Sequence, residues 1–515
     1  MRRPQRRSGK KLNGYSFHKN ESWCTFSETA TQWSSLPIFC AVLWRWCSRE
    51  PGPSPPRYPG ALPFIGNTHQ FLGDGVHMWN LMKDFFYYSL KKGGVIRINI
   101  GLYPTYVITD PDDYLTVANA CLDKPYIYSF AKTWLGNGLV TADVKTWKLH
   151  RKLLNPAFSQ QSLNMFENVF NDQSRRLVDN LRVEVGQGFF DPEPYLIQNI
   201  LETSCQATLN LRPEDNHACG VDYTVATKHL MDSLLERFQK IWLHIPLIFE
   251  WSSLKKKHDE YVKIAADVTT AIIQKRKSQL LQQGDFNNGT DNCKTLLDLL
   301  LHLAANRGVF SDTDIREHLD TIIVASYDTT GSTLLFTLVL LGSHQDVQEL
   351  VYKELQEVLG DTEENLDRHV LSKLVYLEAV LKESMRLYPA IPVVARNVQE
   401  NVKLKNYTVL AGGICFLSIY GLHRHPMWGA DAEQFRPERW LLPGGVPDHP
   451  NAFASFSLGR RNCIGKLYGL MSMKTALAHL LRRYHVTANV NNLVMQWDPV
   501  LRPISGHDIS LQLRI

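Results

Sequence analysis

One short segment near the C-terminus carries the residues best suited to chemistry, Phe456-Ser-Leu-Gly459-Arg-Arg461-Asn-Cys463-Ile-Gly465. The two glycines allow backbone amides to turn toward the cysteine sulfur, and an apolar helix is expected directly behind the loop. Those amides and the helix N-terminus predict a stabilised thiolate with a lowered thiol pKa. Arg461 offers a forked donor for a carboxylate, and Phe456 can shield the sulfur from water. Taken alone, a cysteine in such a loop is better interpreted as a buried, inert residue in a tight turn.

A second segment, Glu383-Ser-Met-Arg386, places an acid and a base three residues apart on an expected helix. Residues at this spacing share a helix face and can pair, although most such pairs are solvated surface bridges. A third segment, Phe435-Arg-Pro-Glu-Arg439-Trp440, follows about fifty residues later with a further arginine.

A fourth segment, Trp147-Lys-Leu-His-Arg151, has an indole and a guanidinium four residues apart, so both can converge on one anion. The fifth segment is Ala325-Ser-Tyr-Asp328-Thr329-Thr330, within a long apolar helix. Acid and hydroxyl groups among Ile, Val and Leu are costly unless they are paired. A threonine that bonds to its own preceding turn is the alternative interpretation for either hydroxyl.

Together these segments resemble the cytochrome P-450 family. The family's haem-binding loop has Phe, Gly, Arg, Cys and Gly at fixed spacing, and the segment from 456 to 465 has all five. The other motifs occur in the family's order, and the similarity covers most of 50–515. The resemblance implies non-covalently held haem b with Cys463 as axial thiolate ligand of the iron, which favours O–O bond cleavage. The expected cofactor-binding residues are Trp147, Arg151, Arg396, Phe456, Gly459, Arg461, Cys463 and Gly465.

The same resemblance gives the other motifs their roles. Trp147, Arg151, Arg396 and Arg461 would hold a haem propionate. Asp328 and Thr329 would be the catalytic pair that delivers protons to dioxygen, while Thr330 packs in the helix. The residues Glu383, Arg386 and Arg439 would form a buried structural network that locks the core around the cysteine loop.

The elements that must position these groups are mostly helical. Apolar periodicity predicts helices over 160–185, 229–241, 259–281, 312–341 and 346–359. Strand-like pieces are few and short, at 94–100, 106–109 and 509–515. We therefore expect a mainly α protein with a small β subdomain, the cytochrome P-450 fold in a single large catalytic domain.

Three regions follow from composition. Residues 1–49 are a basic tail with a short apolar segment, a truncated membrane anchor or a targeting segment. Residues 50–63 are a proline-rich hinge, and 64–515 are the catalytic domain.

Seven of the 56 basic residues lie in the first twenty positions, so the body is close to neutral and a nucleic-acid-binding body is excluded. Nine irregularly spaced cysteines argue against a disulfide framework.

The detailed resemblance is to the family-four branch, which commonly carries Glu-Gly-His before Asp-Thr-Thr in the central helix. Here the three residues are Ala325, Ser326 and Tyr327. Ala325 has no carboxylate, so no ester to haem is expected at this position. Ser326 replaces a glycine that leaves room for dioxygen, and its side chain is expected to narrow that space.

We expect a monooxygenase that inserts one oxygen atom from O2 into a small lipophilic substrate, a fatty acid, hormone-like lipid or xenobiotic. Segments 126–139 and 229–250 are expected to line its pocket.

No nicotinamide or flavin motif is visible, so electrons must come from another protein. By resemblance this is the NADPH-cytochrome P-450 reductase, with cytochrome b5 as an additional donor, at the cytosolic face of the endoplasmic reticulum membrane. A mitochondrial location with a ferredoxin donor is the alternative. Rival functions are a haem-thiolate isomerase or dehydratase and a non-catalytic haem- or lipid-binding protein.

Overall fold

The computed structural model of the chain describes residues 53–209, 211, 221–283, 295–360 and 364–514. The expectations for 1–49 lie outside these residues. The helices of the described part are α2 (Gly75–Lys91), α3 (Pro111–Ala120), α4 (Lys132–Leu135), α5 (Val144–Leu154), α6 (Gln160–Asn164), α7 (Glu167–Leu181), α8 (Glu193–Leu209), α9 (Val221–Gln239), α10 (Pro246–Glu250), α11 (Ser253–Gln283), α12 (Leu296–Arg307), α13 (Asp312–Ser343), α14 (Gln345–Leu359), α15 (Arg368–Lys373), α16 (Val375–Leu387), α17 (Ile419–Leu422) and α18 (Lys466–Arg483).

The strands are short and form one four-stranded sheet and three two-stranded sheets among the described residues. They are β1 (Val95–Ile100), β2 (Tyr103–Ile108), β3 (Val393–Asn397), β4 (Val402–Lys403), β5 (Thr408–Val409), β6 (Ile414–Ser418), β7 (Tyr484–Thr487), β8 (Val494–Gln496), β9 (Arg502–Ser505) and β10 (Ser510–Leu513). The main sheet has the order β1-β2-β6-β3, in which only the β2–β6 pair is parallel. The expected mainly α fold with a small β part is confirmed.

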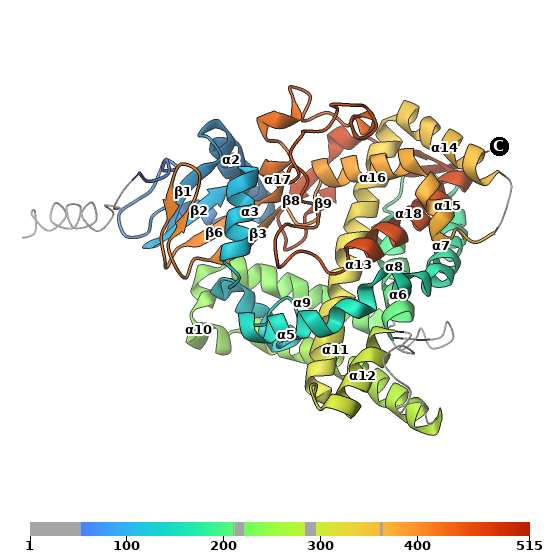
Figure 1. The fold of residues 1–515 in the computed structure, drawn as a ribbon, viewed down its shortest axis with the longest axis horizontal. Helices are drawn as coiled ribbons and strands as arrows, with labels where there is room; N and C mark the ends of the chain where they lie inside the picture. The colour runs from blue at the N-terminus through green and yellow to red at the C-terminus, as the bar shows by residue number, and fades with distance from the viewer. Residues whose placement is uncertain (1–52, 210, 212–220, 284–294, 361–363, 515) are drawn as a thin grey trace, which may run out of the picture. The chain divides into compact units, whose positions relative to one another are not determined.

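Side-chain alternation along β1 explains why both faces of this sheet are covered (Figure 1). Val95 packs with α3 residues such as Val117, whereas Ile96 packs with Phe85 and Phe86 of α2. Successive strand residues point to opposite faces, so a continuous apolar run serves two layers.

The proline-rich segment is bonded to this sheet from its second half onward. The Tyr58 amide donates to the Arg97 carbonyl at 2.8 Å, and the Arg97 amide donates to the Pro56 carbonyl at 2.9 Å. Residues 56–58 therefore extend the edge of the sheet at β1.

Helix α13 runs through the centre of the catalytic body (Figure 1). A capping box begins it: the Ser311 hydroxyl accepts from the Asp314 amide at 3.1 Å, and the Asp314 carboxylate accepts from the Ser311 amide at 2.9 Å. Among the described residues it is the helix long and apolar enough to cross a membrane, yet 83% of its most apolar window is buried. It is the core helix of this fold, and α8 and α11 pack on it.

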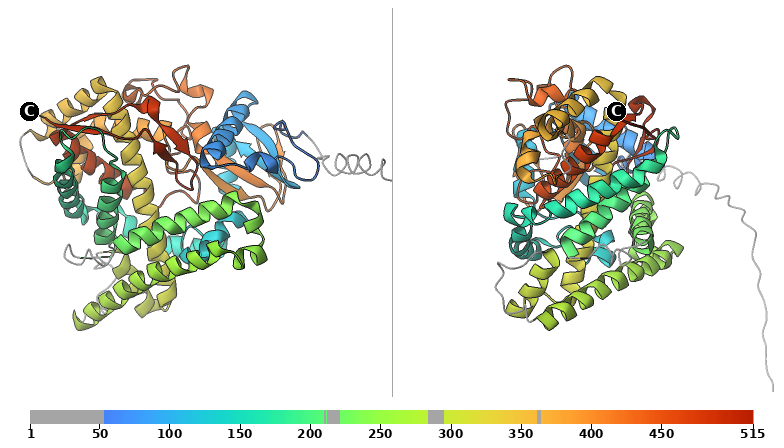
Figure 2. Two further views of the ribbon diagram at one scale, coloured as in Figure 1. Left: turned by 180° about the vertical axis from the view of Figure 1, so that it is seen from behind. Right: turned by 90° about the vertical axis from the view of Figure 1, so that its right-hand side faces the viewer.

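The predicted helices agree well with the structure where the apolar pattern is long. The helix predicted over 312–341 is α13, and that over 346–359 is α14. The stretch predicted as one helix over 160–185 is instead α6 and α7, separated at Met165 and Phe166. Helices α9 and α11, predicted over 229–241 and 259–281, are both longer than expected and lie side by side (Figure 2).

Candidate active site

The cysteine loop ends directly at the start of α18. The Cys463 amide donates to the Phe456 carbonyl at 2.9 Å, which closes the loop. Gly459 has φ +75°, and a Cβ there would come within 3.0 Å of both Ala118 and Asn119 of α3 and its flank. A side chain is therefore excluded at this turn by conformation and by space. The loop holds the sulfur against an internal cavity.

The Cys463 side chain opens onto the cavity, and its thiol has a pKa above its ordinary value because the surrounding protein desolvates the thiolate. A hydrogen bond from the Gly465 amide, together with Arg151 and Lys466, acts in the opposite direction but does not prevail. The expectation that the protein alone lowers this pKa is therefore wrong. The loop supplies some of the expected donors, but stabilisation of the thiolate requires a positive partner such as a metal ion.

A cavity of about 540 Å³ lies between the cysteine loop and α13. Its walls are mainly apolar, with Cys463 at one side and Asp328 and Thr329 at the other. Both predicted lining segments contribute to the walls, the first through Ile127, Phe130 and Leu135 and the second through Met231, Leu234 and Phe238.

Lys124 lines this cavity, and Arg396 and Arg461 lie close enough to Lys124 to act on its charge. Arg396 is 2% exposed and Arg461 is 9% exposed, and the Lys124 ammonium donates to the Val140 carbonyl at 2.6 Å. The Arg461 guanidinium lies over the Trp147 ring, 4.5 Å from its centroid. Among the described residues no carboxylate forms a salt bridge with any of these three cations. Burial and the two arginines lower the pKa of Lys124 well below its ordinary value.

The unpartnered nitrogens of this cluster show what it can bind. Arg461 leaves Nε and Nη1 buried without a partner, and Arg396 leaves Nε. Buried donors of this kind are costly unless an acceptor arrives, and a forked guanidinium matches a carboxylate. The cavity with a cysteine sulfur on one wall and carboxylate-seeking cations at its edge fits a haem group, with Cys463 on the iron and Arg396, Arg461 and Lys124 at the propionates.

Arg151 lies elsewhere than expected from the Trp147–Arg151 spacing. Its Nη1 and Nη2 donate to the Asn462 carbonyl and side-chain oxygens at 2.7 and 3.1 Å, and its Nε donates to Asn155 at 2.8 Å. The structure thus brings Trp147 together with Arg461, while Arg151 ties α5 to the residue before Cys463.

The Glu383 carboxylate is the centre of a buried ion network that joins three segments. Arg386 donates to it through Nε and Nη2 at 2.8 and 2.9 Å, and Arg439 donates through Nε at 2.8 Å. The Trp440 indole adds a bond of 3.0 Å. All three charged side chains are 0% exposed.

The network continues into the cysteine loop through His423. Arg386 donates to the His423 carbonyl at 3.0 Å, and the Ala454 amide donates to His423 Nε2 at 2.9 Å. Nε2 is therefore the acceptor, so Nδ1 carries the proton that bonds the Arg386 carbonyl at 3.0 Å. This histidine connects two parts of the core through hydrogen bonds.

On α13, Asp328 is 1% exposed and forms an ion pair with Arg502 of β9. The Thr329 hydroxyl donates to the Ala325 carbonyl one turn earlier at 2.8 Å, and both residues line the cavity. Burial raises the pKa of Asp328, Arg502 lowers it, and Glu193 raises it. An acid and a hydroxyl thus stand side by side opposite the sulfur.

The two departures from the branch pattern have local explanations. Ala325 presents only a methyl group to the cavity, so no covalent attachment can form there. The Ser326 oxygen lies 2.8 Å from both the Ser204 oxygen of α8 and the Ile323 carbonyl. Its hydroxyl is therefore bonded to α8 and to its own helix. These bonds offset the unfavourable free energy of placing a polar hydroxyl in the core.

Two residues at the site were missed from the sequence, Lys124 and Arg502. Lys124 precedes Pro125 in a loop, and Arg502 lies about 170 positions from Asp328, so neither has periodicity or spacing that would single it out. Only the folded chain brings Lys124 to the cavity and Arg502 to Asp328.

The comparisons with known proteins agree with this geometry. The family model described as Cytochrome P450 matches residues 56–510. Cytochrome P450 4c3 of Drosophila melanogaster is 31% identical over 505 residues, 93% of each chain. Cytochrome P450 4V2 of Mus musculus is 30% identical over 474 residues, 88% of this chain and 90% of the relative. Probable cytochrome P450 4s3 of Drosophila melanogaster is 32% identical over 436 residues, 82% and 86% of the two chains.

A haem-thiolate oxygenase is the class that this fold and site define. The chain belongs to the cytochrome P450 family, and its relatives carry family-four names, which confirms the expected branch. It is a haem-dependent monooxygenase that uses O2, a substrate and an electron donor. The haem supplies oxygen activation when bound. Cys463 would hold the iron and the cation cluster would meet the propionates, while the apolar walls and Asp328 would line the space beside the haem.

Proposed function

We propose that the protein oxidises a small lipophilic molecule, a fatty acid, hormone-like lipid or xenobiotic, that occupies the cavity between α9, α13 and the main sheet. The observation that carries this proposal is the composition of the walls: apolar side chains dominate everywhere except at the cation cluster and around Asp328. Apolar walls bind apolar molecules through surface burial and keep water from the reacting centre. A substrate with a long apolar part fits this distribution.

Asp328 and Thr329 are proposed as the proton-delivery pair. The support is their placement on one turn of α13 at the cavity wall, with the Thr329 hydroxyl already bonded to the Ala325 carbonyl. An acid and a hydroxyl that both line the cavity can each pass a proton to an acceptor there without admitting bulk water. A peroxide-rearranging isomerase or dehydratase has no need for this pair, and a non-catalytic haem- or lipid-binding protein has none either.

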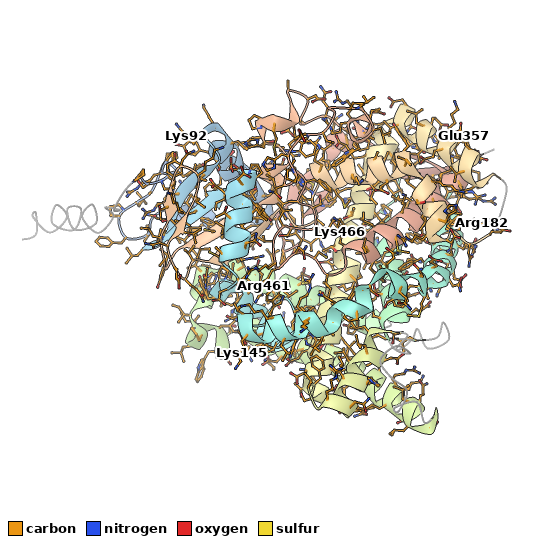
Figure 3. All side chains as sticks on the ribbon, in the orientation of Figure 1. Lys92, Lys145, Arg182, Glu357, Arg461 and Lys466 are labelled. Carbon is orange, nitrogen blue, oxygen red and sulfur yellow. The ribbon has the colours of Figure 1, made fainter. Side chains whose placement is uncertain are left out.

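Electrons are proposed to come from the NADPH-dependent flavoprotein reductase, with cytochrome b5 as an additional donor. Support comes from exposed bases around the cysteine loop: Lys145 and Lys148 on α5, Arg460 in the loop and Lys466 at the start of α18. Lys145 and Lys466 are labelled in Figure 3. A basic face on the thiolate side would steer an acidic donor to the shortest path to the iron.

Attachment to the cytosolic face of the endoplasmic reticulum is proposed from an exposed apolar patch at α10 and its flanks. Trp251 is 87% exposed and Leu247 is 71% exposed, and Trp242, Ile245 and Ile248 are exposed beside them. An amphipathic surface of Trp and Leu suits the boundary between headgroups and acyl chains. A full-length variant with Leu247→Glu and Trp251→Glu should bind phosphatidylcholine vesicles more weakly in a flotation assay than the unchanged protein.

The first test is the reduced, carbon-monoxide difference spectrum of the purified protein beside Cys463→Ala. A thiolate ligand gives the long-wavelength Soret band of this family, and the substitution should abolish that band. A haem-loaded, well-folded protein without the band would contradict the monooxygenase proposal.

The second test is turnover with two electron sources. Candidate lipids and xenobiotics are incubated with NADPH and the flavoprotein reductase, or with a ferredoxin and its reductase. Product formed only with the flavoprotein supports the reticulum location, and product formed only with ferredoxin supports the mitochondrial alternative. Rearrangement of a lipid peroxide without any electron donor would favour the isomerase.

A further inference from the structure

The carboxylate of Asp328 is held from one direction only. Its Oδ1 is paired with Arg502 Nη2, while its Oδ2 is buried without a hydrogen-bond partner among the described residues. The side chain is 1% exposed, so solvent cannot replace a missing partner. A carboxylate with a single anchor takes its orientation and its charge from that anchor.

Arg502 is fixed in turn by an acid nearer the surface. Its Nη1 donates to Glu193 Oε1 at 3.3 Å, and the side chain of Glu193 is 29% exposed against 19% for Arg502. Glu193 is the first residue of α8, and Arg502 is the first residue of β9. The Arg502 guanidinium therefore joins Asp328 in the centre of α13 to Glu193 at the start of α8. Its Nη2 bonds the first carboxylate and its Nη1 bonds the second.

The remaining charged and titratable groups around Asp328 are few. Asp498, in the turn between β8 and β9, is 4% exposed and lines the cavity, and burial raises its pKa to about 7. Tyr327, the neighbour on α13, has a pKa raised by burial. Arg502 is thus the only cation among the described residues that pairs with Asp328, and it faces the three acids Asp328, Glu193 and Asp498.

We infer that Arg502, anchored by Glu193, is the positioning residue of Asp328 in the proton-delivery pair; this rests on the proposed role of Asp328. Arg502 does not exchange protons itself, because guanidinium stays protonated. It holds Oδ1 on the β9 side of α13. Oδ2 is thereby left as the unpaired atom that can take up a proton and pass it toward the cavity that Asp328 lines.

Loss of the guanidinium changes two measurable properties. Without a cation, the buried carboxylate is harder to ionise, so the pKa of Asp328 rises further. A neutral Asp328 also loses its fixed orientation. Proton delivery should then slow by about tenfold to a hundredfold. This loss does not exceed the rate factor of ~10²–10⁴ that general acid catalysis supplies.

The experiment compares Arg502→Met, Arg502→Lys, Glu193→Gln and a matched control, Arg514→Met, in the full-length haem-loaded protein. Arg514 follows β10, has a side chain 7% exposed and pairs with Glu349 at 2.8 Å, so it is a similarly placed arginine away from the cavity. Carbon-monoxide spectra and thermal unfolding show first whether each variant is folded and loaded.

Two readouts then decide the role. The first is the infrared band of protonated carboxyl groups, compared between Arg502→Met and the double variant that adds Asp328→Asn. This measurement needs no turnover. The second is the share of consumed NADPH that appears as hydrogen peroxide, measured against pH with the flavoprotein reductase and no added organic substrate.

The inference expects Arg502→Met to show a protonated-carboxyl band at neutral pH that the double variant lacks. It also expects Arg502→Met to release a larger share of the consumed NADPH as hydrogen peroxide, with a pH profile moved to higher pH. Arg502→Lys should recover part of the loss, Glu193→Gln should show a smaller effect, and Arg514→Met should show none. If Arg502→Met gave the same results as Arg514→Met in both readouts, the positioning role would be overturned. Loss of the carbon-monoxide band in the unchanged protein would contradict the proposed function, whereas the infrared comparison would still decide whether Arg502 controls Asp328.

Discussion

Two buried charge clusters lie on either side of the cysteine loop and differ in one respect. In the Glu383 network, a carboxylate is shared by Arg386 and Arg439, and every Arg386 guanidinium nitrogen donates a hydrogen bond. In the cation cluster, Arg396, Arg461 and Lys124 have no carboxylate in salt-bridge contact among the described residues. In the first cluster the chain itself supplies the compensating carboxylate, and Arg439 Nη1 is the one guanidinium nitrogen of the pair that is buried without a hydrogen-bond partner among the described residues. The second is completed only by a ligand that carries negative charge.

The difference explains why equally buried charges have different functions. A buried ion network without solvent contributes to structure because removing one partner leaves an uncompensated charge. A buried excess of one sign, by contrast, is unfavourable in the protein alone and becomes favourable when the opposite sign binds. Burial and repulsion lower the pKa of Lys124 for this reason, which marks the cluster as a site for the haem propionates.

The largest effect is expected from Glu383→Ala. It leaves two arginines of 0% exposure without their carboxylate, which should destabilise folding by about 3–5 kcal/mol. The free energy of unfolding from urea titration, with and without haem, measures this loss. A haem-free protein as stable as the unchanged chain would refute the structural role of the network.

Next in size is Arg396→Met, which should act on haem retention and not on the fold. Losing one charge-assisted bond of about 1.5–3 kcal/mol should weaken haem binding by about tenfold to a hundredfold. The rate of haem transfer to apomyoglobin measures it, with Arg436→Met as the control because Arg436 is half-exposed and pairs with Asp431. If the haem-free form of Arg396→Met were strongly destabilised, the distinction between the two clusters would fail.

A pH dependence of the haem-free protein should be smaller and specific to Lys124. Its pKa in the folded state lies below that in the unfolded chain, so the unfolded state binds more protons between the two values. Stability should therefore rise with pH in that window, up to the ordinary lysine pKa of about 10.4. Urea titrations across pH should show this rise in the unchanged haem-free protein and a flatter curve in Lys124→Met. Equal slopes for the two proteins would contradict the assignment.

The smallest effect is expected from Glu378→Ala, the matched control for Glu383 on the same helix α16. Glu378 also contacts two cations, Lys382 at 2.8 Å and Lys474 at 2.9 Å, but its side chain is 40% exposed. Solvent screens the pair with Lys382, whereas Lys474 is 7% exposed and would lose its carboxylate, so the loss should be about 1 kcal/mol, the upper end of the range for exposed pairs. Hydrogen bonds to the two lysines lower the pKa of Glu378 to about 2, so its contribution is lost as pH falls from about 4.5 toward 2. A loss equal to that of Glu383→Ala would show that burial is not the deciding variable.

Long periodic segments were predictable, and short or irregular ones were not. The helix expected at Asp312 begins there, because a capping box precedes a long apolar run. The stretch from 160 to 185 has helical composition throughout, yet the chain turns at Phe166, where aromatic packing with Tyr468 of α18 takes precedence. That contact spans some 300 residues, so local pattern carries no trace of it.

The pKa of Cys463 shows a similar division. Spacing and glycines correctly indicated a loop around the sulfur, and the Gly465 amide does donate to it. The sign of the shift depended on how deeply the fold encloses the thiol, which a sequence motif does not specify. Burial outweighs the donors, so the pKa is raised.

The amino-acid sequence by itself determined the family and its haem-thiolate class, and it predicted roles for Arg396, Arg461 and the acid–hydroxyl pair on α13. These are read from residue type at short, fixed spacing, where local geometry limits what side chains can do. The tertiary structure alone decided that Lys124 joins the cation cluster, that Arg151 binds the loop at Asn462, and that Arg502 holds Asp328. Each of these depends on contacts between segments distant in the chain, and burial at those contacts sets the strength and sign of every charge interaction.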